Sequence, residues 1–251
     1  MIRALILFLV IALPAYGETV VSGLSQNRVA ITANFDGSEI LLFGAVKRDA
    51  PPPDANPLNV IITVEGPSEP VTVRRKSKRF GIWVNTDSVQ VDAAPTFYAV
   101  ATTGPFEDIL NSTEDLRYKI SIPRVIRSVG APMTITDAAA FSTALIRIRT
   151  SKGLYQMNPG TVRLDEETLF RTSVALPSNL TEGDYKARIF LLRGGNVVDA
   201  HETAIDVRKV GLERWLFSLA HEKPLIYGLL SLFIAIVAGW GASAVFRYIR
   251  A

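Results

Sequence analysis

The side chains in this sequence that could do chemistry are few and scattered. The chain has no cysteine, which excludes thiol catalysis, disulfides and cysteine-based metal sites. Its only histidines are His201 and His221, and neither lies near an acid–histidine–serine pattern or a metal-binding motif. The acidic run 165–167 could bind a cation, but an exposed turn explains it better. We therefore expect no enzyme activity and no catalytic, cofactor-binding or metal-binding residues; a hydrolase whose carboxylates meet only in the fold is the remaining alternative.

One cationic cluster could bind an anionic partner. Five cations occupy six positions directly before the sequence Phe80-Gly81-Ile82-Trp83: Arg74, Arg75, Lys76, Lys78 and Arg79. At a hairpin tip they would form a focused positive patch for anionic lipid head groups, an anionic solute or an acidic partner. The alternative is a solvated run of charges that protects a strand edge.

Small residues recur every four positions in the apolar segment near the C-terminus. They are Ser231, Ala235, Gly239 and Ser243. Such a ridge allows a second membrane helix to approach closely, so we expect helix packing against a membrane-protein partner or a second copy. Small residues are also common in membrane helices in general, which is the alternative explanation.

The net charge of +3 does not indicate a nucleic-acid partner. The sequence has 27 Lys and Arg residues, and Arg3, Arg247 and Arg250 lie at its ends. Without these three, 24 cations remain in residues 18–223, which also contain all 24 acids. The middle of the chain is therefore formally neutral, and we expect no binding to nucleic acid.

The N-terminus has the three regions of a secretory signal peptide. Arg3 supplies the positive region, residues 4–13 are apolar but too short to span a bilayer, and Pro14 follows. Ala15 and Gly17 place small residues before a cleavage site after Gly17. We expect 1–17 to be removed; an uncleaved anchor or a buried strand is the alternative.

Residues 225–246 contain no charge and predict one transmembrane helix. These 22 positions would extend about 33 Å as a helix, which is enough to cross a hydrocarbon core of about 30 Å. Pro224 suits the first turn, and Tyr227 and Trp240 suit the two interfaces. Export through the signal peptide places the body outside the cytoplasm and leaves only 247–251 inside, although cations on both flanks give no clear charge bias.

The exported body reads as mainly β. Alternating segments at 27–35 and 40–46, joined by Asp36-Gly37, predict a hairpin, and a proline-rich loop covers 51–57. Further strands are expected at 60–64, 71–75, 80–84 and 97–102. This spacing predicts an immunoglobulin-like β-sandwich domain over 18–104.

A helical insertion or linker over 105–157 follows. Its first part has a weak helical pattern, and 137–152 predicts a helix capped by Thr136, with Phe141, Leu145 and Ile148 on one stripe.

A second β region over 158–210 has strands at 161–164, 169–176, 185–192 and 197–207, with a hairpin turn at 193–196. Two arrangements are open: this region has its own core covered by the helix, or it shares a core with the first region.

Residues 211–223 predict an amphipathic helix before the membrane. Leu212, Trp215, Leu216 and Leu219 form its apolar stripe. The stripe could lie on the membrane interface or pack on the β domain.

Several stretches together resemble the uncharacterised alphaproteobacterial family of transmembrane proteins. They include ITANFDGSEILLFGAV, FGIWVN, PTFYAVAT, LFRTSVALPSNLTEGDYKARIFLLRGGNVV and HEKPLIYGLLSLFIAIVAGWGASAVF. The resemblance covers nearly all of 18–246 and implies a Gram-negative inner membrane with a periplasmic body. It also suggests a link to exporters of anionic or sulfur-containing compounds.

The expected function is that of a non-enzymatic accessory or interaction subunit of an inner-membrane complex. The β-rich body would lie in the periplasm and the C-terminal helix would pack against a membrane partner. The alternative is a membrane-tethered periplasmic module that binds a solute or the cell envelope, with the helix as a tether only.

Overall fold

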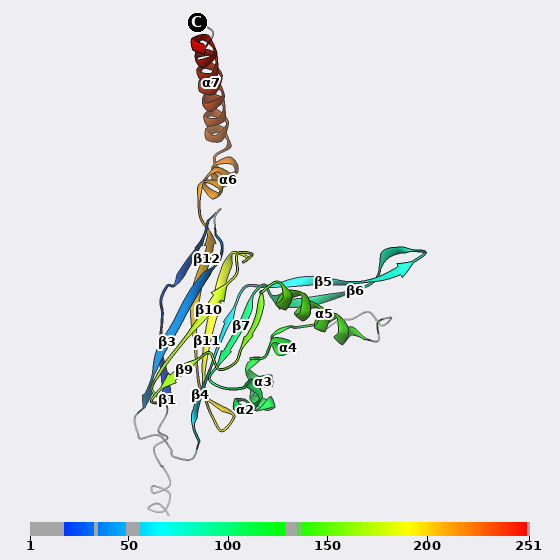
Figure 1. Ribbon diagram of the computed structural model, residues 1–251, viewed down its shortest axis with the longest axis vertical. Coiled ribbons are helices and arrows are strands. Elements are labelled where there is room, and N and C mark those ends of the chain that lie inside the picture. Colours follow the sequence, from blue (N-terminus) through cyan, green and yellow to red (C-terminus); the bar gives the residue numbers. More distant parts are fainter. Residues whose placement is uncertain (1–17, 33–34, 49–55, 129–134, 136, 250–251) are drawn as a thin grey trace, which may run out of the picture. The chain divides into compact units, whose positions relative to one another are not determined.

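The computed structural model describes residues 18–32, 35–48, 56–128, 135 and 137–249 (Figure 1). The predicted signal peptide, most of the loop at 51–57 and the predicted cap Thr136 lie outside these residues. The described chain is mainly β, which confirms the predicted class. Its strands are β1 (Glu18–Leu24), β2 (Arg28–Ile31), β3 (Ser38–Arg48), β4 (Leu58–Glu65), β5 (Ser68–Arg79), β6 (Ile82–Pro95), β7 (Tyr98–Thr102), β8 (Tyr155–Asn158), β9 (Arg163–Asp165), β10 (Leu169–Leu176), β11 (Gly183–Arg193) and β12 (Asn196–Lys209).

The described helices fall into two groups. Those of the insertion are α2 (Phe106–Ile109), α3 (Ser112–Tyr118), α4 (Ile122–Val125) and α5 (Ala138–Ser151). Those of the C-terminal part are α6 (Leu212–Glu222) and α7 (Pro224–Ile249). Of the described residues, 18–29 and 36–207 belong to one compact unit, and the residues between 30 and 35 belong with those from 208 onward to a second, so each unit is described by itself.

Strands from both halves of the sequence alternate within two sheets. One sheet has the order β1-β3-β10-β9 and the other the order β2-β12-β11-β4-β7-β8. β3 pairs with β10, and β4 pairs with β11, in both cases antiparallel. Residues 18–104 and 158–210 therefore share one core rather than forming separate domains. The immunoglobulin-like arrangement predicted for 18–104 is not confirmed, because each sheet is completed by strands from beyond residue 157.

The predicted hairpin around Asp36-Gly37 is wrong. β2 joins the six-stranded sheet beside β12, whereas β3 joins the four-stranded sheet. Gly37 serves the crossing between the sheets instead: its φ is +115°, and a Cβ there would lie 2.8 Å from the Leu176 carbonyl oxygen. Only glycine combines that backbone conformation with so close an approach.

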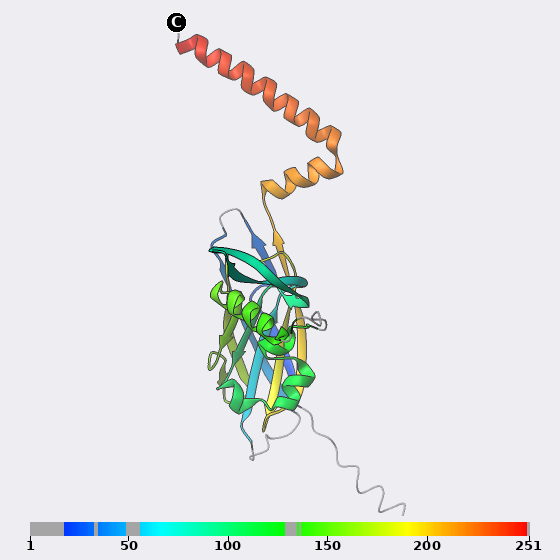
Figure 2. The ribbon, with the colours of Figure 1, turned by 90° about the vertical axis from the view of Figure 1, so that its right-hand side faces the viewer.

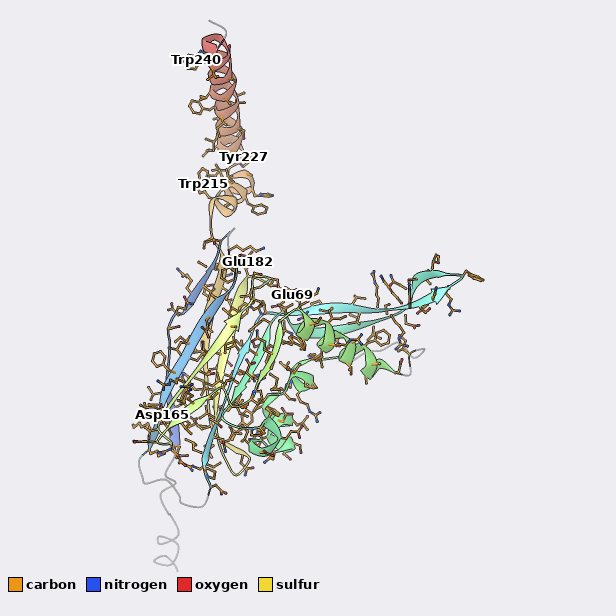
Figure 3. All side chains as sticks on the ribbon, viewed as in Figure 1. Glu69, Asp165, Glu182, Trp215, Tyr227 and Trp240 are labelled. Atoms are coloured by element: carbon orange, nitrogen blue, oxygen red, sulfur yellow. The ribbon has the colours of Figure 1, made fainter. Side chains whose placement is uncertain are left out.

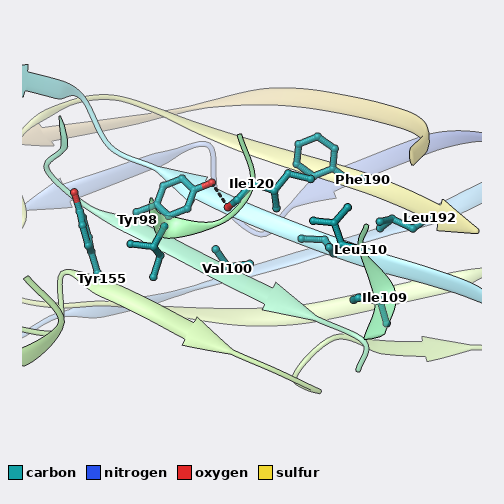
Figure 4. Close-up of a cluster of buried hydrophobic side chains, with 10 residues drawn as sticks. Tyr98, Val100, Ile109, Leu110, Ile120, Tyr155, Phe190 and Leu192 are labelled. Atoms are coloured by element: carbon teal, nitrogen blue, oxygen red, sulfur yellow. Dashed lines mark hydrogen bonds between the residues drawn. The ribbon is translucent and has the colours of Figure 1, made fainter. Parts of the chain in front are cut away.

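The centre of the six-stranded sheet is buried on both faces. On β4 the residues Val60–Val64 are all buried, whereas β10 alternates exposed and buried positions in the way of a strand with one covered face. Figure 4 shows the cluster on the helical side, where Ile61, Tyr98 and Phe190 from the sheet meet Ile109 and Ile120 from the insertion. The helical insertion thus covers the sheet and belongs to its core.

A buried hydrogen-bond network attaches the insertion to the sheet. The Tyr98 hydroxyl donates to the Ile120 carbonyl at 2.7 Å (Figure 4), and Arg188 Nη1 donates to the Tyr118 carbonyl at 2.8 Å. Burial raises the pKa of Tyr98 to about 12, so the phenol remains a donor even near pH 10, where an exposed tyrosine loses its proton. Burial also raises the pKa of Glu65, while the Arg188 guanidinium 3.7 Å away opposes that shift.

α5 forms where a helix is predicted over 137–152, but two details differ. Its N-cap is Asp137, which makes no side-chain cap hydrogen bond and instead pairs with Arg75. Of the predicted apolar stripe, Phe141 and Leu145 are buried, while Ile148 is exposed. α5 contacts β5 and β6, which lie directly above it in Figure 2, and also β8 and α4, and these contacts leave Ile148 exposed.

Candidate functional site

The cationic cluster lies on a long two-stranded ribbon made by β5 and β6 (Figure 1). The strands that were predicted at 71–75 and 80–84 are longer, and Phe80-Gly81 form the turn between them rather than the start of a strand. The hairpin tip on which the anionic-partner hypothesis depends is therefore present.

The base of the ribbon is fixed against α5. Val73, Val89 and Val91 form a buried cluster with Phe141 and Leu145. An additional pair of backbone hydrogen bonds joins the ribbon to the segment after α4, between Ala93 and Arg127, at 2.9 and 3.1 Å. These contacts hold the ribbon as an ordered projection.

Arg75 differs from the other four cations because it belongs to this base. Its guanidinium lies 4.5 Å from the centre of the Phe141 ring and 2.5 Å from an Asp137 oxygen, and Asp87 lies opposite it at 3.9 Å. Arg75 thus stabilises the packing of α5 on the ribbon.

The remaining four cations are exposed toward the tip. Arg74, Lys76 and Lys78 occupy alternate positions and so share one face, while Arg79 lies at the turn opposite Ile82. The structure therefore divides the predicted cluster into one structural residue and four available ones.

The second candidate site is on α7. Pro224–Ser243 is long and apolar enough to cross a membrane, with mean hydropathy 2.0, and α7 begins at Pro224 as predicted. All four ridge residues are exposed on α7, and the Ser231 hydroxyl donates to the Tyr227 carbonyl at 2.9 Å. Because the Ser231 hydroxyl is hydrogen-bonded within α7, it needs no polar partner on another helix, and Ser231 contributes only a small side chain to the surface.

Helical geometry gives α7 two unlike faces. At 3.6 residues per turn, Gly228, Ala238 and Ala242 fall on the same side as the ridge and extend its small-residue surface. Leu232, which is 58% exposed, lies at the edge of this surface between Gly239 and Ser243. Phe233, Val237 and Trp240 fall on the other side and are exposed. Trp240 and Tyr227 are labelled on α7 in Figure 3, with Trp215 on α6. The α6 helix also forms as predicted, whereas its place on the membrane interface stays a prediction.

An ion-pair cluster that the sequence did not reveal closes one end of the β unit. Arg193 donates to both Glu18 oxygens, at 2.8 Å from Nε and 2.7 Å from Nη2, and Nη2 lies 3.2 Å from Glu167. Arg48 adds a 2.7 Å bond to Glu18. The hydrogen bond from Arg193 holds the pKa of Glu18 below its usual 4.5, despite partial burial that raises it. These residues link β1, β3 and β11, so their role is structural.

Among the residues that the structure describes, a β-rich unit is followed by one apolar helix of spanning length, which is the architecture of a membrane protein with a candidate C-terminal span. The chain belongs to the family described as "Putative transmembrane protein" (Alph_Pro_TM), which matches residues 19–248. The match includes both the ribbon and α7. No curated protein matches the chain.

Proposed function

We propose that the protein is a non-enzymatic accessory or interaction subunit of an inner-membrane complex, with its β unit in the periplasm and α7 packed against a membrane partner. The observation that carries this proposal is the division of α7 into a small-residue face and a bulky face. A helix that only tethers a domain does not need small residues to be gathered on one face, although such residues are common in membrane helices in general. A face of small residues instead permits close van der Waals packing with another helix.

The composition of α7 limits what it can do in such a complex. Residues 225–246 contain no Asp, Glu, Lys, Arg or His, so α7 offers no route for ions or protons by itself. A packing role remains compatible with this composition. The partner that the family resemblance favours is an exporter of anionic or sulfur-containing compounds.

The orientation in the proposal rests on the predicted signal peptide. Glu18 follows the predicted cleavage site, and its side chain is bound by Arg48 and Arg193. Cleavage after Gly17 would thus release the chain at a residue that the fold holds in place. Edman sequencing or intact-mass measurement of the membrane-extracted protein should give Glu18 as the first residue.

Gly239→Leu should disrupt the complex, and Gly241→Leu should not. Neither glycine has a neighbour within 4 Å of an added Cβ, so both variants are compatible with the fold. Gly239 lies on the small-residue face, while Gly241 lies two residues away on the bulky face. The measurement is mild-detergent purification of the full chain followed by mass spectrometry.

The proposal expects a membrane-protein partner, or a second copy of the chain, that co-purifies with the wild type and with Gly241→Leu but is reduced at least tenfold with Gly239→Leu, on the order expected for a close-packed contact. Retention of the partner by Gly239→Leu, or equal loss in both variants, would remove the packing role. Retention by a chain lacking 211–251 would favour the tether instead.

A further inference from the structure

The tip of the β5–β6 ribbon projects three large apolar side chains into solvent. Phe80 is fully exposed, at 107%, and Ile82 and Trp83 are exposed by 65% and 67%. Within the part of the chain that the structure describes, they contribute nothing to either buried cluster near the ribbon. Apolar side chains grouped at the end of an ordered projection indicate a contact outside the fold.

The turn itself is built against local backbone preference. Phe80 and Gly81 have φ values of 49° and 89° and form a two-residue loop between the paired residues Arg79 and Ile82. Loops of this kind favour Asn-Gly, because asparagine tolerates a positive φ. A bulky residue in this region costs about 1 kcal/mol or more. Phenylalanine at this position therefore weakens the turn. A residue that is unfavourable for the local backbone indicates that its exposed ring has a role outside the turn.

Cations surround the apolar tip without any acid. Lys78 lies opposite Trp83, Lys76 opposite Asn85 and Arg79 opposite Ile82. Residues 76–84 contain no Asp or Glu, and the nearest acid on β6, Asp87, already pairs with Arg75. From the buried Val73 to Arg79, β5 extends about 20 Å at about 3.4 Å per residue. The tip thus combines an apolar end with neighbouring cations, and both lie at some distance from the packed base of the ribbon.

We propose that the ribbon tip inserts into the anionic lipid surface of the bilayer that holds α7. Tryptophan favours the membrane interface, where its ring is buried and its N–H stays near polar groups. Lysine and arginine can lay their alkyl stems along the apolar region and keep their charges at the head groups. An anionic surface supplies the complementary charge. Because α7 anchors the chain, that bilayer is present at high effective concentration.

The test uses the full chain with Trp215→Phe and Trp240→Phe, so that Trp83 is the only indole. The protein is placed in nanodiscs of phosphatidylcholine, or of phosphatidylcholine with phosphatidylglycerol, with and without bromine on the acyl chains. We expect Trp83 emission to shift to shorter wavelength and to be quenched by the brominated lipid in the anionic discs. Added salt should reverse both effects.

Phe80→Asn separates insertion from folding. Asn-Gly is the preferred sequence for this loop, so the variant should keep or raise the thermal unfolding midpoint while losing most of the quenching. Lys76→Gln, Lys78→Gln and Arg79→Gln should each lower the equilibrium constant between the inserted and the free tip, measured from the quenched fraction, about fivefold. Arg171→Gln is the matched control, because Arg171 is an exposed cation on β10 and should leave the quenching unchanged.

Three outcomes would overturn the proposal. Trp83 emission that stays solvent-like in both kinds of disc would show that the tip does not insert. A blue shift without quenching by brominated lipid would place Trp83 against protein, on a second copy or a partner. Quenching only by brominated anionic vesicles added to unbrominated discs would show that the tip contacts a different membrane.

Discussion

Arg193→Met should destabilise the β unit by about 3 kcal/mol, as expected when one partner of a buried ion pair is removed. The Arg193 side chain is only 9% exposed and is bound by Glu18 and Glu167, so its loss leaves two carboxylates with Arg48 as their nearest remaining cation. Chemical denaturation of the full chain in detergent, followed by far-UV circular dichroism, measures the change. Arg171→Met is the matched control: its pair with Asp165 spans 3.6 Å between side chains that are both 57% exposed, so it should cost less than about 0.5 kcal/mol.

Acid provides a second measurement of the same cluster. The pKa of Glu18 is lowered in the fold, chiefly by the hydrogen bond from Arg193. A lowered carboxyl pKa stabilises the fold above the unfolded value and loses that contribution as the pH falls through the folded one. Wild-type stability should therefore decrease below about pH 4.5, and Glu18→Gln should show less of this decrease while being less stable at pH 7. If the free energy of unfolding depended on pH in the same way in wild type and Glu18→Gln, the proposed stabilisation by the Glu18 ion pairs would be wrong.

Gly44→Ala should destabilise the four-stranded sheet by about 3 kcal/mol, near the upper end for overpacking of a core. Gly44 lies on β3 between β1 and β10, and a Cβ there would lie 2.4 Å from Phe170 Cζ and 2.6 Å from the Val21 carbonyl oxygen. The Phe170 ring is buried over this glycine, so neither neighbour can retreat without disturbing the sheet.

The control for this prediction is Gly104→Ala, where the nearest atom to an added Cβ is Ile109 Cγ2 at an ordinary 3.5 Å. It should change stability by less than about 0.5 kcal/mol. In the double variant, Phe170→Leu should restore part of the loss from Gly44→Ala, because it removes the ring but not the Val21 carbonyl. If Gly44→Ala were as stable as Gly104→Ala, the close packing of β1, β3 and β10 would be incorrect.

Local patterns predicted the elements whose neighbours match their sequence period. The alternation over 169–176 gave β10 with its bounds, and the uncharged run after Pro224 gave α7. The positive φ at Gly194 and Gly195 accounts for the correctly predicted turn between β11 and β12. In these elements the pattern of buried and exposed residues repeats within the segment itself, so it can be recognised from the sequence alone.

Pairing over long distances could not be read in the same way. The Asp36-Gly37 pair suggested a hairpin, but β2 pairs with β12, which lies far along the chain. β8 was missed because it is short and pairs in parallel with β7. Parallel strands are not joined by a hairpin turn, so no turn sequence marks this pair. The cluster of Glu18, Arg48, Glu167 and Arg193 was missed because its members meet only when both halves of the chain form common sheets.

The two candidate sites were predicted in part, for a related reason. Charge counting located the cationic cluster but could not separate Arg75, whose partners Phe141 and Asp137 lie on α5. Four-residue spacing located the ridge on α7 with Ala238 and Ala242 beside it, while Gly228 was recognised only when the whole helical surface was considered. Sequence spacing thus identifies which residues share a face, whereas the fold decides which of them remain available to a partner.

The central claim is that the small-residue face of α7 contacts another membrane helix, and cross-linking inside the membrane tests it most directly. A photoreactive diazirine analogue of leucine replaces Leu232, at the edge of the small-residue face, or Val237, on the bulky face, in the full chain, so that little bulk is added to the contact. Illumination of intact cells should give a discrete protein adduct from position 232 and none from position 237. The adduct should disappear when Gly239→Leu is added and persist with Gly241→Leu. Equal adducts from both positions, or none from position 232, would contradict the account.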